Sequence, residues 1–174
     1  MNTDQILNHL KLICKNKAQY AVLASDQLRT FKIKKFPVCL VINTDPSYKK
    51  GTHWISIFKK SKHCDVEVFD SYGLGLDFWS DDLKQIQKQN CIFQNKVPLQ
   101  SLNSNVCGKY ALYFLYKRMK GCKPWTIYSR FSNDRKKNDS KVDTFIKSKQ
   151  YLFNSKCSFK TKIQVCKSFK LAIK

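Results

Sequence analysis

Cys107 stands where a polar loop turns into an unbroken apolar segment. The loop runs from Gln100 to Val106, and the apolar segment from Ala111 to Tyr116. This pattern predicts that Cys107 lies in the first turn of a buried helix, where the positive end of the helix dipole favours a thiolate over a thiol. A thiolate is the nucleophile of cysteine hydrolases, which also need a base and an oxyanion donor.

A base and a carboxylate for such a nucleophile lie upstream, in two alternating segments that predict a β-hairpin. The segments are 53–58 and 65–70, and the residues between them are mostly polar and basic. If the strands pair symmetrically around this loop, one face of the hairpin is apolar and ends in a His–Asp pair. The pairs predicted to face each other are Ile57–Val66, Ile55–Val68 and His53–Asp70. Asp70 would then hold one imidazole nitrogen of His53 while the other nitrogen faces the nucleophile.

Two further residues near these positions suit a hydrolase site. Gln100 precedes the cysteine by seven residues, and its side-chain N–H is a neutral donor suited to an oxyanion hole, together with the backbone N–H of Cys107. Trp54 is predicted either to line a substrate cleft or to pack under the hairpin. Taken singly, His53 reads as an ordinary strand-end histidine, Asp70 as the first residue of a turn, and Gln100 as a loop glutamine. The combination favours catalysis.

The chain that must position these residues has the length and composition of one domain. Its 174 residues suit a single domain over 1–174, and a hydrophobic content of 43% supports a packed core. Besides the hairpin, the predicted elements are helices over 4–16 (with Thr3 as N-cap), 81–89 and 106–120, and a buried strand over 38–42. Residues 132–174 are basic with sparse apolar positions, which predicts loosely packed helices or a flexible tail.

The charge of the chain is strongly positive. The sequence has 33 basic and 12 acidic residues, for a formal net charge of +21. Such a field attracts polyanions, so we expect nonspecific, salt-sensitive binding of duplex DNA. An AT-rich genome would produce the same excess of lysine without selection for DNA binding. A basic nucleic-acid-binding core protein is the alternative from another functional class.

The cysteines and the N-terminus bear on compartment and cofactors. The eight cysteines include no Cys-x-x-Cys spacing, and the three histidines form no paired-ligand pattern, so we expect no metal site. The N-terminus lacks the basic and apolar regions of a signal peptide, and no apolar stretch approaches the length of a membrane span. We therefore expect an intracellular, reducing location, no membrane association and a monomer.

Together these residues resemble the adenovirus endopeptidase (adenain) family. The resembling segments are Asn43-Thr44, Gly51 to Trp54, Phe69 to Gly73 and Gln100 to Gly108. The order His, acid, Gln, Cys and the spacings of 17 and seven residues agree with the family, whereas 132–174 match weakly.

The resemblance implies a papain-like α+β fold, with a central mixed sheet packed against helices. It also implies a cysteine endopeptidase that uses a Cys–His–Asp triad of Cys107, His53 and Asp70, with Gln100 as oxyanion donor. Its substrates would be viral capsid and core precursors, cleaved after Gly-containing motifs during virion maturation, in the host nucleus and the virion. The implied cofactors are duplex DNA and a small activating peptide that pairs with an enzyme cysteine, for which Cys91 is the candidate.

The acid departs from the adenain pattern. Adenain typically has Glu where this chain has Asp70, and Asp is usual in the related SUMO- and ubiquitin-like-specific proteases. A ubiquitin-like or SUMO-type deconjugating protease is therefore the alternative within the same chemistry.

Overall fold

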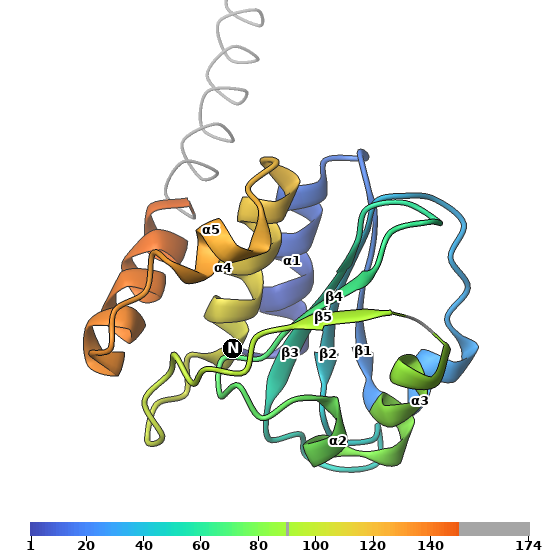
Figure 1. Ribbon diagram of the computed structural model, residues 1–174, viewed down its shortest axis with the longest axis horizontal. Coiled ribbons are helices and arrows are strands. Elements are labelled where there is room, and N and C mark those ends of the chain that lie inside the picture. The colour runs from blue at the N-terminus through green and yellow to red at the C-terminus, as the bar shows by residue number, and fades with distance from the viewer. Residues whose placement is uncertain (90, 150–174) are drawn as a thin grey trace, which may run out of the picture.

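The computed structural model describes residues 1–89 and 91–149, and its centre is a mixed sheet (Figure 1). The five strands lie in the order β1-β2-β3-β4-β5. Their bounds are β1 Gln19–Ala24, β2 Val38–Asn43, β3 Trp54–Lys59, β4 Val66–Phe69 and β5 Ile92–Gln94. The outer strands β1 and β5 run parallel to their neighbours, whereas β2, β3 and β4 pair antiparallel. The predicted α+β fold is confirmed.

Helices cover both faces of this sheet. They are α1 Thr3–Cys14, α2 Leu76–Trp79, α3 Asp81–Gln89, α4 Cys107–Met119 and α5 Pro124–Tyr128, with the 3-10 helix η1 Ser25–Thr30 and helical residues 135–149. In Figure 1, α1, α4 and α5 lie on one side of the sheet and α3 lies on the other. Each face has its own apolar core. Along β2, Cys39 and Val41 pack with α1 and α4 on one face of the sheet. The alternating residues Leu40 and Ile42 pack with α2 and α3 on the other face. Burial on both faces explains why 38–42 is a continuous apolar run.

Helix α1 begins at Thr3, one residue before the predicted start, because its N-cap is Asn2 and not Thr3. Asn2, not Thr3, is the N-cap: its side chain accepts a hydrogen bond from the Gln5 N–H at 2.9 Å, and the Gln5 side chain accepts from the Asn2 N–H at 3.1 Å. This reciprocal capping box satisfies two N–H groups at once, which the Thr3 hydroxyl could not do from inside the helix.

The hairpin forms, but in a different register from the prediction. The observed pairs are Ser56–Phe69, Ile57–Val68 and Phe58–Glu67, which is a shift of two residues. The loop closes as a turn in which the Cys64 N–H donates to the Ser61 carbonyl, and the centre of this turn sets the register. A two-residue shift leaves every side chain on its predicted face, because side chains alternate with period two.

The C-terminal described segment is packed more tightly than its composition suggests. Val142 and Ile146, on one face of the helical residues 135–149, are buried in the core shared by α1 and α4. The helix expected in this segment is confirmed over 135–149, whereas its packing is not loose at Val142 and Ile146, because these apolar residues recur at the four-residue spacing that one helix face requires. The rest of that prediction, over 150–174, lies outside the described residues. None of the helices in the described part of the chain is long and apolar enough to span a membrane.

Candidate functional site

The predicted site residues come from the ends of three elements that meet at one edge of the fold. Cys107 is the first residue of α4, His53 directly precedes β3, and Asp70 directly follows β4. The elements approach closely at Gly108, where an added Cβ would lie 3.3 Å from Ile6 Cδ1 and 3.5 Å from Trp54 Cδ1. Figure 1 shows the chain's N-terminus beside this first turn of α4. Glycine after Cys107 thus allows α1 and β3 to reach the cysteine.

His53 and Asp70 form a buried pair. His53 Nε2 lies 2.8 Å from Asp70 Oδ1, and each residue is only 2% exposed. The carboxylate accepts three more hydrogen bonds: from the Tyr72 N–H at 2.9 Å, the Leu74 N–H at 3.1 Å and Trp79 Nε1 at 3.0 Å. Burial alone would raise the pKa of Asp70, but His53 and these donors hold it below its ordinary value. Asp70 is therefore a fixed anion.

Asp70 also opens a turn, so the two alternatives weighed from the sequence are both present. The Gly73 N–H donates to the Asp70 carbonyl at 2.9 Å, and Gly73 has a φ of +68°. Asn95 bridges the same backbone: its Oδ1 accepts from the Asp70 N–H at 2.9 Å, and its Nδ2 donates to the Asp70 carbonyl at 2.6 Å. The turn delivers the Tyr72 and Leu74 N–H groups to the carboxylate.

Two aromatic rings enclose the imidazole. Tyr72 and Trp79 each stack on His53, with ring centroids 4.6 Å from the imidazole centroid. The rings shield the His–Asp contact from water and limit rotation of His53. Sequence reasoning missed both residues. Tyr72 could have been noticed inside the turn Asp-Ser-Tyr-Gly, but nothing in the local pattern connects Trp79 to the histidine.

The Cys107 thiol and the His53 imidazole stabilise each other's charged form. For His53, burial lowers the pKa, but the hydrogen bond to Asp70 and the interaction with Cys107 outweigh it and raise the pKa to about 9. For Cys107, burial raises the pKa, but His53 and the nearby backbone N–H groups of Trp54 and Gly108 lower it below the ordinary value. His53 Nδ1, the ring nitrogen that Asp70 does not hold, has no hydrogen-bond partner. It is therefore the nitrogen available to Cys107. The site favours a thiolate–imidazolium pair.

Gln100 is fully buried and reaches the site through Tyr72. Its Oε1 accepts a hydrogen bond from the Ser71 hydroxyl at 2.7 Å, and its Nε2 donates to the Ser104 carbonyl at 2.8 Å. The same Nε2 lies 3.4 Å from the Tyr72 hydroxyl. The pKa of Tyr72 is raised first by burial and then by the negative charge of Cys107. The two N–H groups of Gln100 are thus directed at the Ser104 carbonyl and, over a longer distance, at the Tyr72 hydroxyl.

Trp54 packs into the core and also borders a hollow, and its role in a substrate cleft stays a prediction. Its side chain packs against the α1–α4 core, and it also lines a hollow of about 560 Å³. The hollow is bounded by the start of α1 and by the loop after β2, with Asn43, Gly51 and Lys50 in its wall. It adjoins the site because Trp54 directly follows His53 and lies against Gly108.

Cys91 is exposed, and its thiol is free. It precedes the edge strand β5, and its carbonyl accepts a hydrogen bond from the Val66 N–H at 2.9 Å. None of the cysteines within 1–89 and 91–149 forms a disulfide, and no group of three His, Cys, Asp or Glu side chains in those ranges could hold a metal ion.

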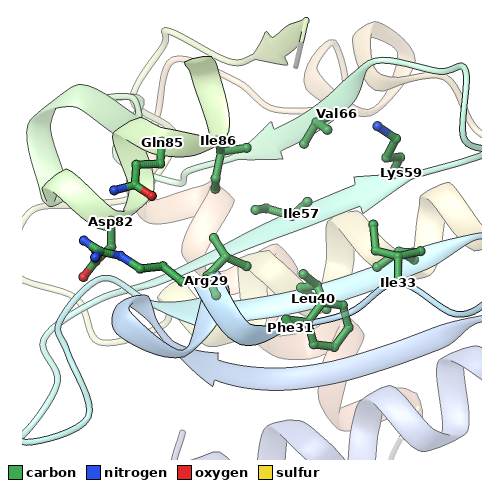
Figure 2. A pocket seen from close by; sticks show the side chains of 12 residues that line it. Arg29, Phe31, Ile33, Leu40, Ile57, Lys59, Val66, Asp82, Gln85 and Ile86 are labelled. Atoms are coloured by element: carbon green, nitrogen blue, oxygen red, sulfur yellow. The ribbon is translucent and has the colours of Figure 1, made fainter. Parts of the chain in front are cut away.

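A second hollow of about 320 Å³ lies on the opposite face of the sheet (Figure 2). Leu40, Ile57 and Val66 line it, Arg29 and Asp82 form an ion pair at one end, and Lys59 lies at the other. None of the predicted site residues lines this hollow. It is an apolar gap between the sheet, η1 and α3, separate from the Cys107 site.

Comparison with known proteins supports the fold. The sequence matches no family model and no curated protein. Among solved structures, the fold is similar to two crystal structures of the ASFV pS273R protease, one of selenomethionine-labelled protein. One has a TM-score of 0.56 at 15% identity over 82% of this chain, and the other 0.54 at 17% over 81%. The chain spans about two thirds of those proteases, 66% and 65% of their lengths. The fold is therefore that of a known protease, whereas adenain family membership stays a prediction.

Proposed function

We propose that this chain is a cysteine endopeptidase with a Cys107–His53–Asp70 triad. The observation that carries the proposal is the buried His53–Asp70 pair beside Cys107, in which the pKa of the imidazole is raised to about 9 and that of the thiol is lowered. Such opposite shifts favour a reactive thiolate near neutral pH. The likeness to a solved protease supports the same function.

The proposed reaction proceeds through a thioester. The Cys107 thiolate attacks the scissile carbonyl. The oxyanion is bound by the Cys107 N–H, which belongs to the helical first turn and has no acceptor within the helix, and by Gln100 Nε2, which exchanges its long 3.4 Å contact with the Tyr72 hydroxyl for the oxyanion. His53 then gives its proton to the leaving amine. Water, deprotonated by His53, then hydrolyses the thioester, which restores the thiolate of Cys107 and the imidazolium of His53. Asp70 keeps the imidazole oriented in both steps.

The substrates proposed are viral capsid and core precursors, cut after Gly-containing motifs during virion maturation in the host nucleus and the virion. Trp54 and the hollow beside it would receive the substrate. The net charge of +21 supports nonspecific binding of duplex DNA as a stimulating cofactor. A small activating peptide could reach Cys91, whose thiol is exposed and free. No metal takes part in the proposed reaction, and the enzyme is proposed to act as a monomer.

A second candidate is a deconjugating protease for ubiquitin-like or SUMO-type modifiers. The observation that favours it is the acid itself, because Asp70 contacts His53 directly through Oδ1. Asp at this place resembles the modifier-specific proteases more than adenain. The basic nucleic-acid-binding core protein is less favoured, since it leaves the His53–Asp70–Cys107 arrangement without a purpose.

The test is hydrolysis of a fluorogenic peptide containing Leu-x-Gly-Gly, with and without duplex DNA, using Cys107→Ala as control. Turnover that needs Cys107 and rises with DNA is the expected result. Turnover indifferent to DNA, together with cleavage of a folded ubiquitin-like precursor, favours the deconjugating protease. Salt-dependent DNA binding that is unchanged in Cys107→Ala, without any hydrolysis, favours the core protein.

A further inference from the structure

The helical residues 135–149 hold the loop that carries Gln100. Asn138, on this helix, is only 2% exposed. Its Nδ2 donates to the Leu99 carbonyl at 3.1 Å and to the Ser132 carbonyl at 2.8 Å, and its Oδ1 accepts from the Ser132 N–H at 2.9 Å and hydroxyl at 3.3 Å. Both donor positions of this amide are therefore used, and its oxygen accepts from the Ser132 N–H and shares the Ser132 hydroxyl proton with the Asp134 carbonyl, 3.2 Å from that hydroxyl.

The peptide unit between Leu99 and Gln100 is fixed at both ends. Its oxygen accepts from Asn138 and lies 3.0 Å from the Tyr110 hydroxyl of α4, whose single proton is shared with Asp139 Oδ1 at the same distance. Its nitrogen donates to the Ser71 carbonyl at 3.0 Å. Because a peptide unit is planar and rigid, these contacts set the position from which the Gln100 side chain leaves the backbone.

The far side of Gln100 contacts the same helix. The Asp139 carboxylate accepts from the Ser101 N–H at 3.4 Å and shares the proton of the Tyr110 hydroxyl with the Leu99 carbonyl. The residues before and after Gln100 are thus both joined to adjacent positions of helix 135–149. Ser71 and Ser104 then orient the side-chain amide itself.

We propose that Asn138 is a positioning residue for the oxyanion donor Gln100, acting through the Leu99 carbonyl. The inference rests on the proposed peptidase function and deepens it. Helix 135–149 is then part of the oxyanion hole's support, although none of its side chains touches substrate. Small displacements of a catalytic group are costly, so a moved Leu99–Gln100 peptide weakens turnover without disturbing the thiolate pair.

The main test variant is Asn138→Asp, which keeps the size of the side chain but sets a carboxylate oxygen against the Leu99 and Ser132 carbonyls. Tyr110→Phe keeps the ring and removes the hydroxyl whose proton is shared between the Leu99 carbonyl and Asp139. The matched control is Asp134→Ala, which weakens the start of the same helix by removing the acceptor for the Lys137 N–H, 3.1 Å away, without touching Leu99. Each variant is assayed for kcat and KM, for alkylation of Cys107 by iodoacetamide, and for affinity of a Gly-Gly peptide aldehyde.

We expect kcat to fall about tenfold in Asn138→Asp and about threefold in Tyr110→Phe, with KM unchanged, because an oxyanion donor is displaced but not deleted. Aldehyde affinity should fall in parallel, since its hemithioacetal oxygen uses the same donor. Alkylation, which needs no oxyanion hole, should stay within about twofold. Equal losses in Asp134→Ala, alkylation that falls with kcat, or wild-type kcat in both test variants would each overturn the proposal.

A readout without turnover separates this inference from the proposed function. The side-chain NH₂ resonances of Gln100, identified by their loss in Gln100→Ala, should shift in Asn138→Asp and Tyr110→Phe but not in Asp134→Ala. Unshifted resonances in both test variants would overturn the positioning role even in an active enzyme. If the wild-type chain hydrolyses no peptide, the proposed function fails, and the resonances still decide whether Asn138 positions Gln100.

Discussion

Two ion pairs of the described residues lie at opposite ends of the β3–β4–α4 unit: His53–Asp70 is buried, and Arg118–Glu67 is partly buried. They differ in whether every polar atom has a hydrogen-bond partner. Arg118 of α4 binds Glu67 of β4 through two nitrogens, with Nη2 to Oε1 at 2.7 Å. A further nitrogen donates to the Cys122 carbonyl, and the guanidinium lies 4.6 Å from the centre of the Phe58 ring. In the other pair, His53 Nδ1 has no hydrogen-bond partner.

The difference separates a structural pair from a site suited to chemistry. The Arg118 guanidinium is held by a bidentate partner, a carbonyl and a ring, and it cannot lose its proton in a protein. His53 has one nitrogen fixed by Asp70 and one open beside a thiol, and an imidazole exchanges protons near neutral pH. The two anions also differ. Burial dominates at Glu67 and raises its pKa, whereas the surrounding donors lower that of Asp70.

The largest expected effect is that of Cys107→Ala. Turnover of the Gly-Gly peptide should fall at least about 10³-fold, because the nucleophile is gone and only binding and the oxyanion hole remain. The melting temperature, followed by circular dichroism, should change little, since the substitution removes one sulfur. Residual hydrolysis above a few percent of wild type would remove Cys107 as the nucleophile.

Asp70→Asn and Glu67→Gln should have opposite effects on activity and stability. Asp70→Asn should lower kcat about 10²–10⁴-fold, because the imidazole loses its orienting anion. Glu67→Gln should leave kcat of the folded enzyme near wild type but lower the free energy of unfolding by up to about 3 kcal/mol, because the partly buried Arg118 loses its charged partner and keeps only the Cys122 carbonyl and the Phe58 ring.

Kinetics below the melting temperature, combined with urea denaturation, measure both quantities for each variant. A large loss of kcat in Glu67→Gln, or an Asp70→Asn enzyme that is unstable but fully active, would invalidate the comparison between the two pairs.

The pH profile should report the thiolate–imidazolium pair. The active form needs Cys107 deprotonated, and the pKa of this thiol is lowered, so kcat/KM should rise at a pH below the ordinary range of thiols. It also needs His53 protonated, and the His53 pKa of about 9 predicts that activity is lost as the pH rises through that value. In Asp70→Asn the basic limb should move to lower pH, because the anion that supports the imidazolium is gone. A basic limb that stays at the same pH in Asp70→Asn would show that Asp70 does not raise the pKa of His53.

The smallest predicted effect is that of Trp79→Phe. This variant keeps an aromatic ring over His53 but removes the Nε1–H that donates to Asp70 at 3.0 Å. Two backbone N–H groups still hold the carboxylate, so kcat should fall only about two- to tenfold, since one of several hydrogen bonds to a charged group is lost. Trp79→Ala, which also removes the ring, serves as the stronger variant and should lose more. Equal kcat in both variants and the wild type would exclude a role for Trp79.

Local pattern was sufficient for much of the fold but not for its exact register. Alternation in 53–58 and 65–70 predicted which face each side chain occupies, and this survived a two-residue shift because the period is two. The register itself depended on the Ser61–Cys64 turn, whose chemistry was not visible in a polar, basic loop. His53 therefore meets Asp70 from the residue before the strand, not as a directly opposed pair.

The candidate site was predicted in its residue types and not in its surroundings. His53, Asp70, Gln100 and Cys107 were identifiable because each is chemically distinctive and lies beside a turn, strand end or helix start. Trp79 and Asn138 were not, because a tryptophan in a short helix and an asparagine in a basic segment are ordinary in sequence. Trp79 contacts His53, 26 residues earlier in the chain, and Asn138 contacts Leu99, 39 residues earlier. Their roles arise from these long-range contacts.

By itself, the sequence determined the class of fold, the faces of the strands, the buried helix that begins at Cys107, and the residue types available for chemistry. These follow from periodicity and from helix-end preferences, which act over a few residues. Tertiary structure alone decided that His53 lies between two rings, that Asp70 is a fixed anion, and that Gln100 is held by a helix from the C-terminal part of the described chain. Those properties depend on burial and on hydrogen bonds between distant segments, whose geometry no local pattern specifies.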